Sequence, residues 1–263
     1  MLDRILADTR RRVEALRHEP RLPGLEGLAQ AAPPPPSLAE RLRAPGVQLI
    51  AEVKRRSPSR GDLAPGLDPA ALATGYACGG AAAISVLTEP FHFNGSLADL
   101  DAVRTALQRD WAALPLLRKD FLLDPIQVME ARAYGAAAVL LIAAALAPGD
   151  LARLYQEAEG WGLGALCEVH DERDLDAVLT LGARIVGINS RNLRDMTVDL
   201  GVVERLRPRA PAGVLVVAES GVRGPADVRR LRDLGVDAVL VGEALVCAPD
   251  PEKAARALVE AGR

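Results

Sequence analysis

The chain has 263 residues, of which 49% are hydrophobic, and a formal net charge of -3. This length and composition can bury one large core, and the weakly acidic balance offers no basic surface to a nucleic-acid backbone. The cysteines, Cys78, Cys167 and Cys247, include no close pair, which argues against disulfides and cysteine-based metal sites. The longest apolar stretches fall short of the ~20 residues of a membrane helix. We therefore expect a cytoplasmic protein without nucleic-acid or membrane partners.

Residues 1–46 are predicted to form a helical extension ahead of the main fold. Apolar residues recur at helical spacing from Leu2 to Leu16, which predicts an amphipathic helix, and the arginine run 10–12 is interpreted as its solvated face. Pro33–Pro36 indicate a stiff spacer before a second short helix around Leu38 to Leu42. The segment has acidic residues and lacks an apolar signal core, so we expect no targeting peptide.

Apolar, β-branched runs alternate with helical segments over residues 47–263. Proline in a first helical turn, as at Pro69 and Pro125, and glycine at the far end, as at Gly135 and Gly235, mark the helices. Eight strand–helix units predict an α/β fold of the (β/α)8 TIM-barrel class, in one domain spanning residues 1–263 with the helical extension. The predicted strands are Val47–Val53, Ala82–Leu87, Leu114–Leu117, Ala138–Ile142, Gly164–Cys167, Arg184–Ile188, Val214–Ala218 and Ala238–Val241.

Polar residues close most of the predicted strands. The carboxyl ends of the strands form the active-site mouth of a parallel barrel, so these residues are the candidates for chemistry. Glu52 and Lys54 lie two residues apart, on the same strand face as Ile50, and should both point into the mouth. The other candidates at strand ends are Lys119, Glu168, Asn189, Arg191, Glu219 and Ser220.

Lysine is rare in this chain, and its positions are informative. Only Lys54, Lys119 and Lys253 occur among 32 basic residues, so arginine supplies nearly every other positive charge. An ammonium group can exchange its proton when desolvated or crowded, whereas arginine stays protonated, so acid–base or Schiff-base chemistry calls for lysine. Lys54 and Lys119 end strands, which favours a function, whereas Lys253 is expected on the surface.

Glu52, Glu168 and Glu219 should meet these lysines in the mouth. Charged groups are rarely buried unless they are paired, so we expect carboxylates beside ammonium groups, with mutually perturbed pKa values. A purely structural ion-pair network is the alternative. Asn189 and Arg191 could donate hydrogen bonds to a substrate, or could cap a loop.

Small residues follow the last two predicted strands, as Ser220-Gly221 and Gly242-Glu243. Backbone N–H groups can approach an anion at such positions, and these two strands carry the phosphate site of many barrels. A single glycine would equally serve an ordinary turn. Together the two loops predict a small-molecule ligand that carries a sugar phosphate.

The histidines and the cysteine beside Glu168 are interpreted as structural. His92 lies between two aromatic residues, His170 is expected to point away from Glu168 or to lie beyond it, and His18 is expected on the surface. Unclustered histidines argue against a metal site. Cys167 should be buried and inert because it faces away from the mouth.

Five linked motifs follow one another along the chain: Leu49–Lys54 with Ser57-Pro58-Ser59, Ser85–Glu89, Leu117–Phe121, Gly187–Arg191 and Glu219–Gly221. Together they resemble indole-3-glycerol phosphate synthase of tryptophan biosynthesis. The resemblance runs in order from about Leu49 to Leu245, and the N-terminal helices are similar to that family's cover over the barrel mouth. Ala137, Met196 and Val246-Cys247 depart from the usual pattern, and none of them is a proposed acid or base.

The resemblance implies a carboxy-lyase that needs no metal or organic cofactor. Its substrate would be 1-(o-carboxyphenylamino)-1-deoxyribulose 5-phosphate, whose ring carbon attacks the ketone before carbon dioxide and water are lost. Lys119 would act as the general acid, and Glu168 would stabilise the cationic intermediate or take a proton. Lys54, oriented by Glu52, would assist dehydration. The residues that would hold hydroxyls and lysines in place are Asn189, Glu219 and Ser220.

The resemblance also implies substrate contacts and leaves two alternatives open. The anthranilate ring would be walled by Phe93, Phe121, Leu141 and Leu193, and the phosphate or carboxylate would be bound by Ser57, Arg191, Ser220, Gly221, Gly242 and Glu243. The chain could also associate with other enzymes of tryptophan biosynthesis. An isomerase of the phosphoribosylanthranilate type would share the phosphate loops but would rely on aspartate and cysteine. A non-catalytic barrel subunit would have lost its strand-end charges, and none is lost here.

Overall fold

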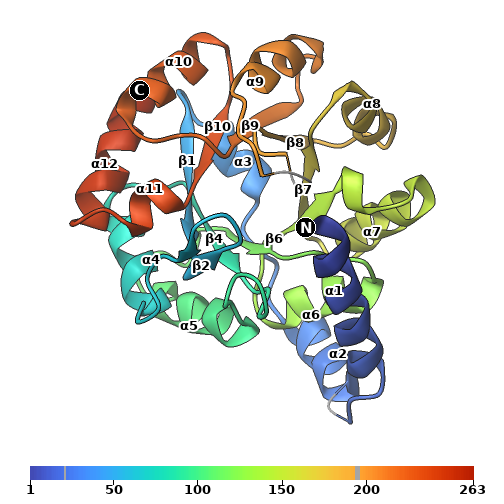
Figure 1. Cartoon of the computed structure of the whole chain (residues 1–263). Helices are drawn as coiled ribbons and strands as arrows, with labels where there is room; N and C mark the ends of the chain where they lie inside the picture. Colours follow the sequence, from blue (N-terminus) through green and yellow to red (C-terminus); the bar gives the residue numbers. More distant parts are fainter. Residues whose placement is uncertain (21, 193–195) are drawn as a thin grey trace.

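The computed structural model describes residues 1–20, 22–192 and 196–263. At its centre, strands in the order β1-β10-β9-β8-β7-β6-β5-β4 form a closed parallel barrel, which confirms the predicted fold class (Figure 1). Gln48 of β1 pairs with Ala238 of β10, and Ile50 pairs with Ala83 of β4, so β1 closes the ring. The barrel strands are β1 (Gln48–Val53), β4 (Ala83–Leu87), β5 (Leu116–Lys119), β6 (Ala138–Ile142), β7 (Gly164–Val169), β8 (Ile185–Asn189), β9 (Leu215–Glu219) and β10 (Ala238–Val241).

The observed strands differ from the predicted runs mainly at their carboxyl ends. β5, β7, β8 and β9 continue into the polar residues that were expected to follow them, and Asn189 pairs with Glu219 across β8 and β9. Backbone pairing continues there because ladder hydrogen bonds do not depend on side-chain polarity. The hairpin β2 (Arg56–Ser57) and β3 (Gly61–Asp62) was not predicted, since such short strands carry no periodic signal.

Capped helices follow the strands and ring the barrel in Figure 1. The side chain of Asp68 accepts hydrogen bonds from the backbone of Ala70 and Ala71, and Asp124 forms a capping box with Gln127. These caps fix where the helices begin and therefore the lengths of the loops around the mouth. The helices are α4 (Pro69–Cys78), α5 (Leu97–Leu107), α6 (Pro125–Ala133), α7 (Pro148–Gly160), α8 (Glu172–Thr180), α9 (Gly201–Leu206), α10 (Pro225–Asp233), α11 (Glu243–Val246) and α12 (Pro251–Gly262), with 3-10 turns η1 (Ala143–Ala145) and η2 (Arg207–Arg209).

Alternate side chains of each strand divide the core into two layers. Ile50, Leu117 and Leu166 belong to the cluster inside the barrel, whereas Cys167 belongs to the layer between strands and helices. Glu52, Lys119 and Glu168 each lie two residues beyond one of these inward side chains. Because side chains two residues apart on a strand share a face, the inward-facing side chains are apolar inside the barrel and charged at its mouth.

Three helices precede the barrel: α1 (Leu2–Arg17), α2 (Leu22–Ala31) and α3 (Leu38–Leu42). Residues Leu2, Ile5 and Leu6 of α1 belong to the same buried cluster as Phe121. Figure 1 shows α1 and α2 on the side of the barrel formed by α6. Helix α2 was not predicted because its glycines interrupt the helical pattern.

Helix α3 lies at the opposite end of the barrel, with Leu38 beside Gly164, the first residue of β7. The helical extension therefore reaches both ends of the barrel. Across the described ranges, no helix is long and apolar enough to cross a membrane.

Candidate active site at the barrel mouth

A cavity of about 780 Å³ opens at the carboxyl ends of the strands. Its size suits a small-molecule ligand. Almost all of the predicted site residues line it, from every part of the barrel rim. They are Glu52, Lys54, Ser57, Phe93, Lys119, Phe121, Glu168, Asn189, Arg191, Glu219, Ser220, Gly221, Gly242 and Glu243.

One predicted substrate contact, Leu141, does not line the cavity. The expectation for Leu141 is wrong, because its side chain packs in the layer between strands and helices. Its neighbours Leu140 and Ile142 line the cavity instead, since alternate residues of β6 face inward. Leu193 lies outside the described residues.

Glu52 and Lys54 form a close ion pair in the mouth. The Nζ atom of Lys54 lies 2.6 Å from Oε1 of Glu52, a residue only 4% exposed. Burial opposes ionisation of Glu52, but the charges of Lys54 and Lys119 outweigh it and lower the pKa of this carboxyl. A side chain at Gly242 would collide with the Glu52 carboxylate. Gly242, which has no side chain, therefore leaves space for the Glu52 carboxylate. The sequence did not indicate this role of Gly242.

Lys119 stands between two carboxylates from different strands. Its Nζ atom lies 3.6 Å from Oε2 of Glu168 and 3.6 Å from Oε2 of Glu219. Burial disfavours the charged lysine, but the charges of Glu219, Glu168 and Glu52 outweigh burial and raise the pKa of Lys119. Lys119 is therefore protonated at neutral pH, which suits a proton donor rather than a Schiff-base amine.

Glu219 is the carboxyl group of this cluster that keeps its proton at neutral pH. Its burial, reinforced by the charge of Glu168 and opposed by that of Lys119, raises the pKa of Glu219 to about 8. Its carboxylate occupies the space that a side chain at Gly187 would need. The inward-facing glycine of β8 thus lets a buried carboxyl approach Lys119.

The loops after β8 and β9 have defined local geometries. The Oδ1 atom of Asn189 accepts a hydrogen bond from the backbone N–H of Arg191 at 2.9 Å, so Asn189 does cap its loop. The guanidinium of Arg191 donates to the carbonyl of Met196 at 3.2 Å. Ser220 and Gly221 both have left-handed backbones, with φ of 64° and 85°. Small residues suit this turn, since bulky side chains are strained there.

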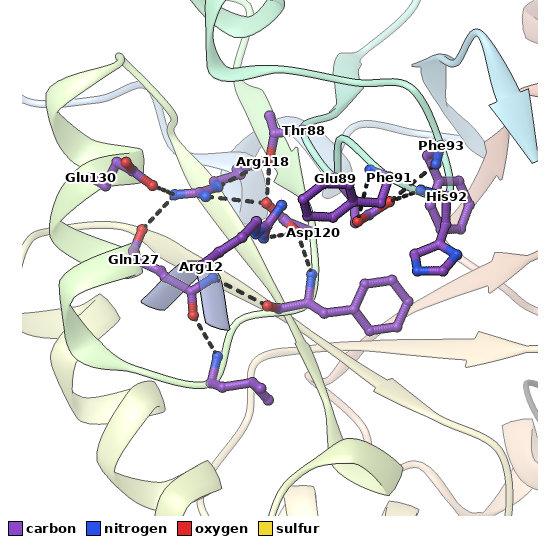
Figure 2. A network of polar contacts seen from close by, with 12 residues as sticks. Arg12, Thr88, Glu89, Phe91, His92, Phe93, Arg118, Asp120, Gln127 and Glu130 are labelled. Atoms are coloured by element: carbon purple, nitrogen blue, oxygen red, sulfur yellow. Dashed lines mark hydrogen bonds and ion pairs between the residues drawn. The ribbon is translucent and has the colours of Figure 1, made fainter. Parts of the chain in front are cut away.

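A buried polar network supports the loop after β5, as Figure 2 shows. One oxygen of Asp120 accepts from the hydroxyl of Thr88 at 2.7 Å and from Arg118 at 3.1 Å. The other accepts from the backbone N–H of Phe121 at 2.8 Å and from Arg12 of α1 at 3.0 Å. The arginine run was predicted to be a solvated face, and this prediction is wrong for Arg12. It ties α1 to the residue that follows Lys119.

The loop after β4 is built around a second buried carboxylate. Glu89 accepts hydrogen bonds from the backbone N–H groups of Phe91, His92 and Phe93 at 3.1, 2.6 and 3.1 Å (Figure 2). The ring of Phe93 lies 6.2 Å from that of Phe121, measured between centroids. Glu89 and Asp120 thus order the two loops that bring these aromatic rings together. Sequence reasoning missed both roles, although each acid lies within a recognised motif.

His170 lies against the mouth cluster rather than away from it. Residues two apart on a strand share a face, and Nε2 of His170 lies 3.4 Å from Oε1 of Glu168. Of the two expectations for His170, the one that it points away from Glu168 is wrong, and the one that it lies one step beyond Glu168 agrees with the structure. Cys167 is fully buried, as predicted, and burial raises the pKa of its thiol to about 12. His18 is exposed, as predicted.

Fold and site together define the chain as a TIM-barrel protein of the enzyme class, with paired lysines and glutamates in its mouth. The model of the family described as Indole-3-glycerol phosphate synthase matches residues 2–258. A synthase of this name from Parafrankia sp. is 51% identical over 99% of this chain and 96% of its own length. Another from Mycolicibacterium gilvum is 49% identical over 100% of this chain and 94% of its own. The chain belongs to the indole-3-glycerol phosphate synthase family, carboxy-lyases of tryptophan biosynthesis.

More distant solved structures share the architecture. The thiamine phosphate pyrophosphorylase from Pyrococcus furiosus superposes with a TM-score of 0.63 at 20% identity, covering 86% of this chain and 97% of that one. At this identity the likeness shows the barrel fold alone.

Proposed function

We propose that this mouth converts 1-(o-carboxyphenylamino)-1-deoxyribulose 5-phosphate into indole-3-glycerol phosphate, carbon dioxide and water, with Lys119 as the first proton donor. The observation that carries the proposal is the protonated Lys119 ammonium, held 3.6 Å from both Glu168 and Glu219. A preorganised cation of this kind stabilises negative charge that develops on a ketone oxygen.

In the first step, the ring carbon that bears the carboxylate attacks the ketone carbon. A carbon–carbon bond forms, and the ketone oxygen takes a proton from Lys119 and becomes a hydroxyl. The aromatic ring and its nitrogen then carry a positive charge. The Glu168 carboxylate, which is only 1% exposed, stabilises this cation in the water-poor floor of the mouth.

Loss of carbon dioxide returns the bond's electron pair to the ring and restores its aromaticity. The hydroxyl then leaves as water with a proton from Lys54, and the neighbouring carbon gives up a proton to a carboxylate, Glu168 in this account. The ion pair with Glu52 at 2.6 Å orients Lys54 for this later step. Each proton transfer is therefore assigned to a side chain of the mouth.

The cavity offers distinct regions for the two ends of the substrate. Phe93 and Phe121 wall the aromatic ring, with Leu140 and Ile142 in place of Leu141. The loops after β9 and β10 hold the phosphate together with Ser57 and Arg191. The carboxylate of Glu243 pairs with Arg60 at 3.1 Å, so its backbone N–H rather than its side chain is assigned to the phosphate.

The test supplies this substrate to the protein in the presence of a metal chelator and measures the formation of indole-3-glycerol phosphate. We expect full turnover by the parent protein and at least ~100-fold lower turnover by Lys119→Met and Glu168→Gln. Lys253→Met is the matched control, because that lysine is 81% exposed and does not line the cavity. No turnover by the folded parent would refute the reaction, and near-normal rates in both variants would refute the roles.

The alternatives fit less well. A sugar-phosphate isomerase using aspartate and cysteine does not explain a mouth built on two lysines. Asp120 and Cys247 also line the cavity, but Asp120 is paired with Arg12 and Arg118. A non-catalytic subunit does not explain the intact cluster of lysines and glutamates. A cytoplasmic location and association with other enzymes of the pathway stay predictions.

A further inference from the structure

His170 lies between two carboxylates at the end of β7. Its Nε2 atom is 3.4 Å from Oε1 of Glu168, and its Nδ1 atom is 3.8 Å from Oδ2 of Asp174 on α8. Within the described residues, Oε1 of Glu168 has no hydrogen-bond partner, whereas Oε2 faces Lys119 at 3.6 Å. His170 is therefore the group that faces the outer oxygen of the Glu168 carboxylate.

The local backbone sets the imidazole in this place. The backbone N–H of His170 donates to Oδ2 of Asp174 at 3.1 Å. Asp174 in turn is fixed in the first turn of α8, where its backbone N–H donates to the side chain of the capping residue Asp171 at 2.9 Å. Strand and helix cap thus hold the ring against Glu168 before any substrate binds.

The surroundings of the ring favour its cation. The charged groups in contact with His170 among the described residues are the carboxylates of Glu168 on β7 and Asp174 on α8, and the carboxyl of Glu219 on β9 lies further away. Burial opposes protonation, but the contact with Asp174 and the charges of Glu168 and Asp174 outweigh it and raise the pKa of His170 above its usual value. Lys119 contacts the other oxygen of Glu168.

We propose that His170 is a positioning residue for ring closure, whose imidazolium holds Oε1 of Glu168. The other oxygen of Glu168 is thereby turned towards Lys119 and the substrate. His170 does not line the cavity, so it acts through Glu168 and not on the substrate. The inference rests on the role proposed above for Glu168.

The first test compares the pH profiles of His170→Gln and His170→Leu. The acidic limb of kcat/KM reports the essential base of the free enzyme. Loss of the positive charge should move this limb to higher pH in both variants. Since glutamine keeps a hydrogen-bond donor, it should lose less kcat than leucine. An acidic limb that stays at the parental pH in both variants would overturn the proposal.

His92→Gln is the matched control. His92 is similarly buried and also faces a carboxylate, Asp8 at 2.9 Å, but this carboxylate belongs to α1 and lies outside the mouth cluster. Whatever its effect on the rate, this variant should leave the acidic limb in place. A shift as large as that of the His170 variants would show a general effect of losing a buried histidine and would overturn the proposal.

The second test needs no catalysis and separates this proposal from the proposed function. The chain has only three histidines, so their ring signals can be assigned by substitution in an NMR titration. We expect His170 to titrate above the usual value of about 6.5, and Glu168→Gln to lower its pKa. If the pKa of His170 is the same in the parent and in Glu168→Gln, the coupling between the two residues is refuted, even if the parent protein is a fully active synthase.

Discussion

The carboxylate of Glu219 fills the space that a side chain at Gly187 would need on the neighbouring strand β8. A Cβ at this glycine would collide with the end of the Glu219 side chain. Gly242, the residue directly after β10, stands in the same relation to Glu52 of β1. These two glycines thus let buried carboxylates fit among the lysines of the mouth.

Gly187→Ala should therefore push the Glu219 carboxylate away from Lys119 while leaving the barrel folded. Misplacing a reacting group by about an ångström costs up to ~100-fold in rate, so we expect kcat to fall by roughly 10- to 100-fold. Gly164→Ala is the control, because its Cβ would find an ordinary contact 3.4 Å from Ala138. Equal kcat values in the two variants, both with parental melting temperatures, would contradict this reading of Gly187.

Glu219→Gln should stabilise the protein at alkaline pH although it impairs catalysis. The pKa of Glu219 rises from 4.5 to about 8 on folding, so the folded state binds an extra proton between these values. Stability due to this group is then present at low pH and lost as the pH rises through this window. Since each pKa unit corresponds to about 1.4 kcal/mol, the variant should be several kcal/mol more stable than the parent near pH 8, with a higher melting temperature, and equally stable near pH 4. A difference that does not depend on pH would refute the assignment.

Arg12→Met should destabilise the protein at neutral pH, because it removes a partner of Asp120, whose side chain is fully buried. We expect a loss of about 1–3 kcal/mol in the free energy of unfolding. Burial opposes ionisation of Asp120, but Arg12 and Arg118 lower its pKa, so this contribution is lost as the pH falls below about 4.

Arg11→Met provides the comparison in the same helix. Its side chain is 79% exposed and pairs only at the surface, so we expect a change within about 0.5 kcal/mol. Chemical unfolding measures both variants. If residues 1–263 form one domain, as the sequence predicts, α1 and the barrel should unfold in a single transition. Equal stabilities of the two variants would show that the tie between Arg12 and Asp120 contributes nothing.

The barrel and most of the mouth follow from local patterns in the sequence. A strand period of two places Glu52 and Lys54 on one face, and the rule for parallel barrels places their carboxyl ends in the mouth. The same period places Leu141 in the layer between strands and helices, contrary to the expectation for it, and His170 on the face of Glu168, one step beyond it.

Other features depend on contacts that no local pattern encodes. The arginine run 10–12 looks uniform in the sequence, yet only the docking of α1 brings Arg12 to Asp120. In the sequence Gly187 resembles any other strand glycine. Only the structure shows that the carboxylate of Glu219 occupies the space beside it. Glu89 shows no periodic signal, since its partners are backbone N–H groups of its own loop.

The most direct test of the account compares the step blocked by each lysine substitution. With substrate labelled in the carboxyl group, single-turnover experiments measure carbon dioxide release and indole formation separately. If Lys119 donates the first proton and Lys54 assists dehydration, Lys119→Met should release neither product at an appreciable rate. Lys54→Met should release carbon dioxide and form indole-3-glycerol phosphate more slowly than it releases carbon dioxide. Carbon dioxide release by Lys119→Met at the parental rate, or equal loss of both products in Lys54→Met, would contradict the account.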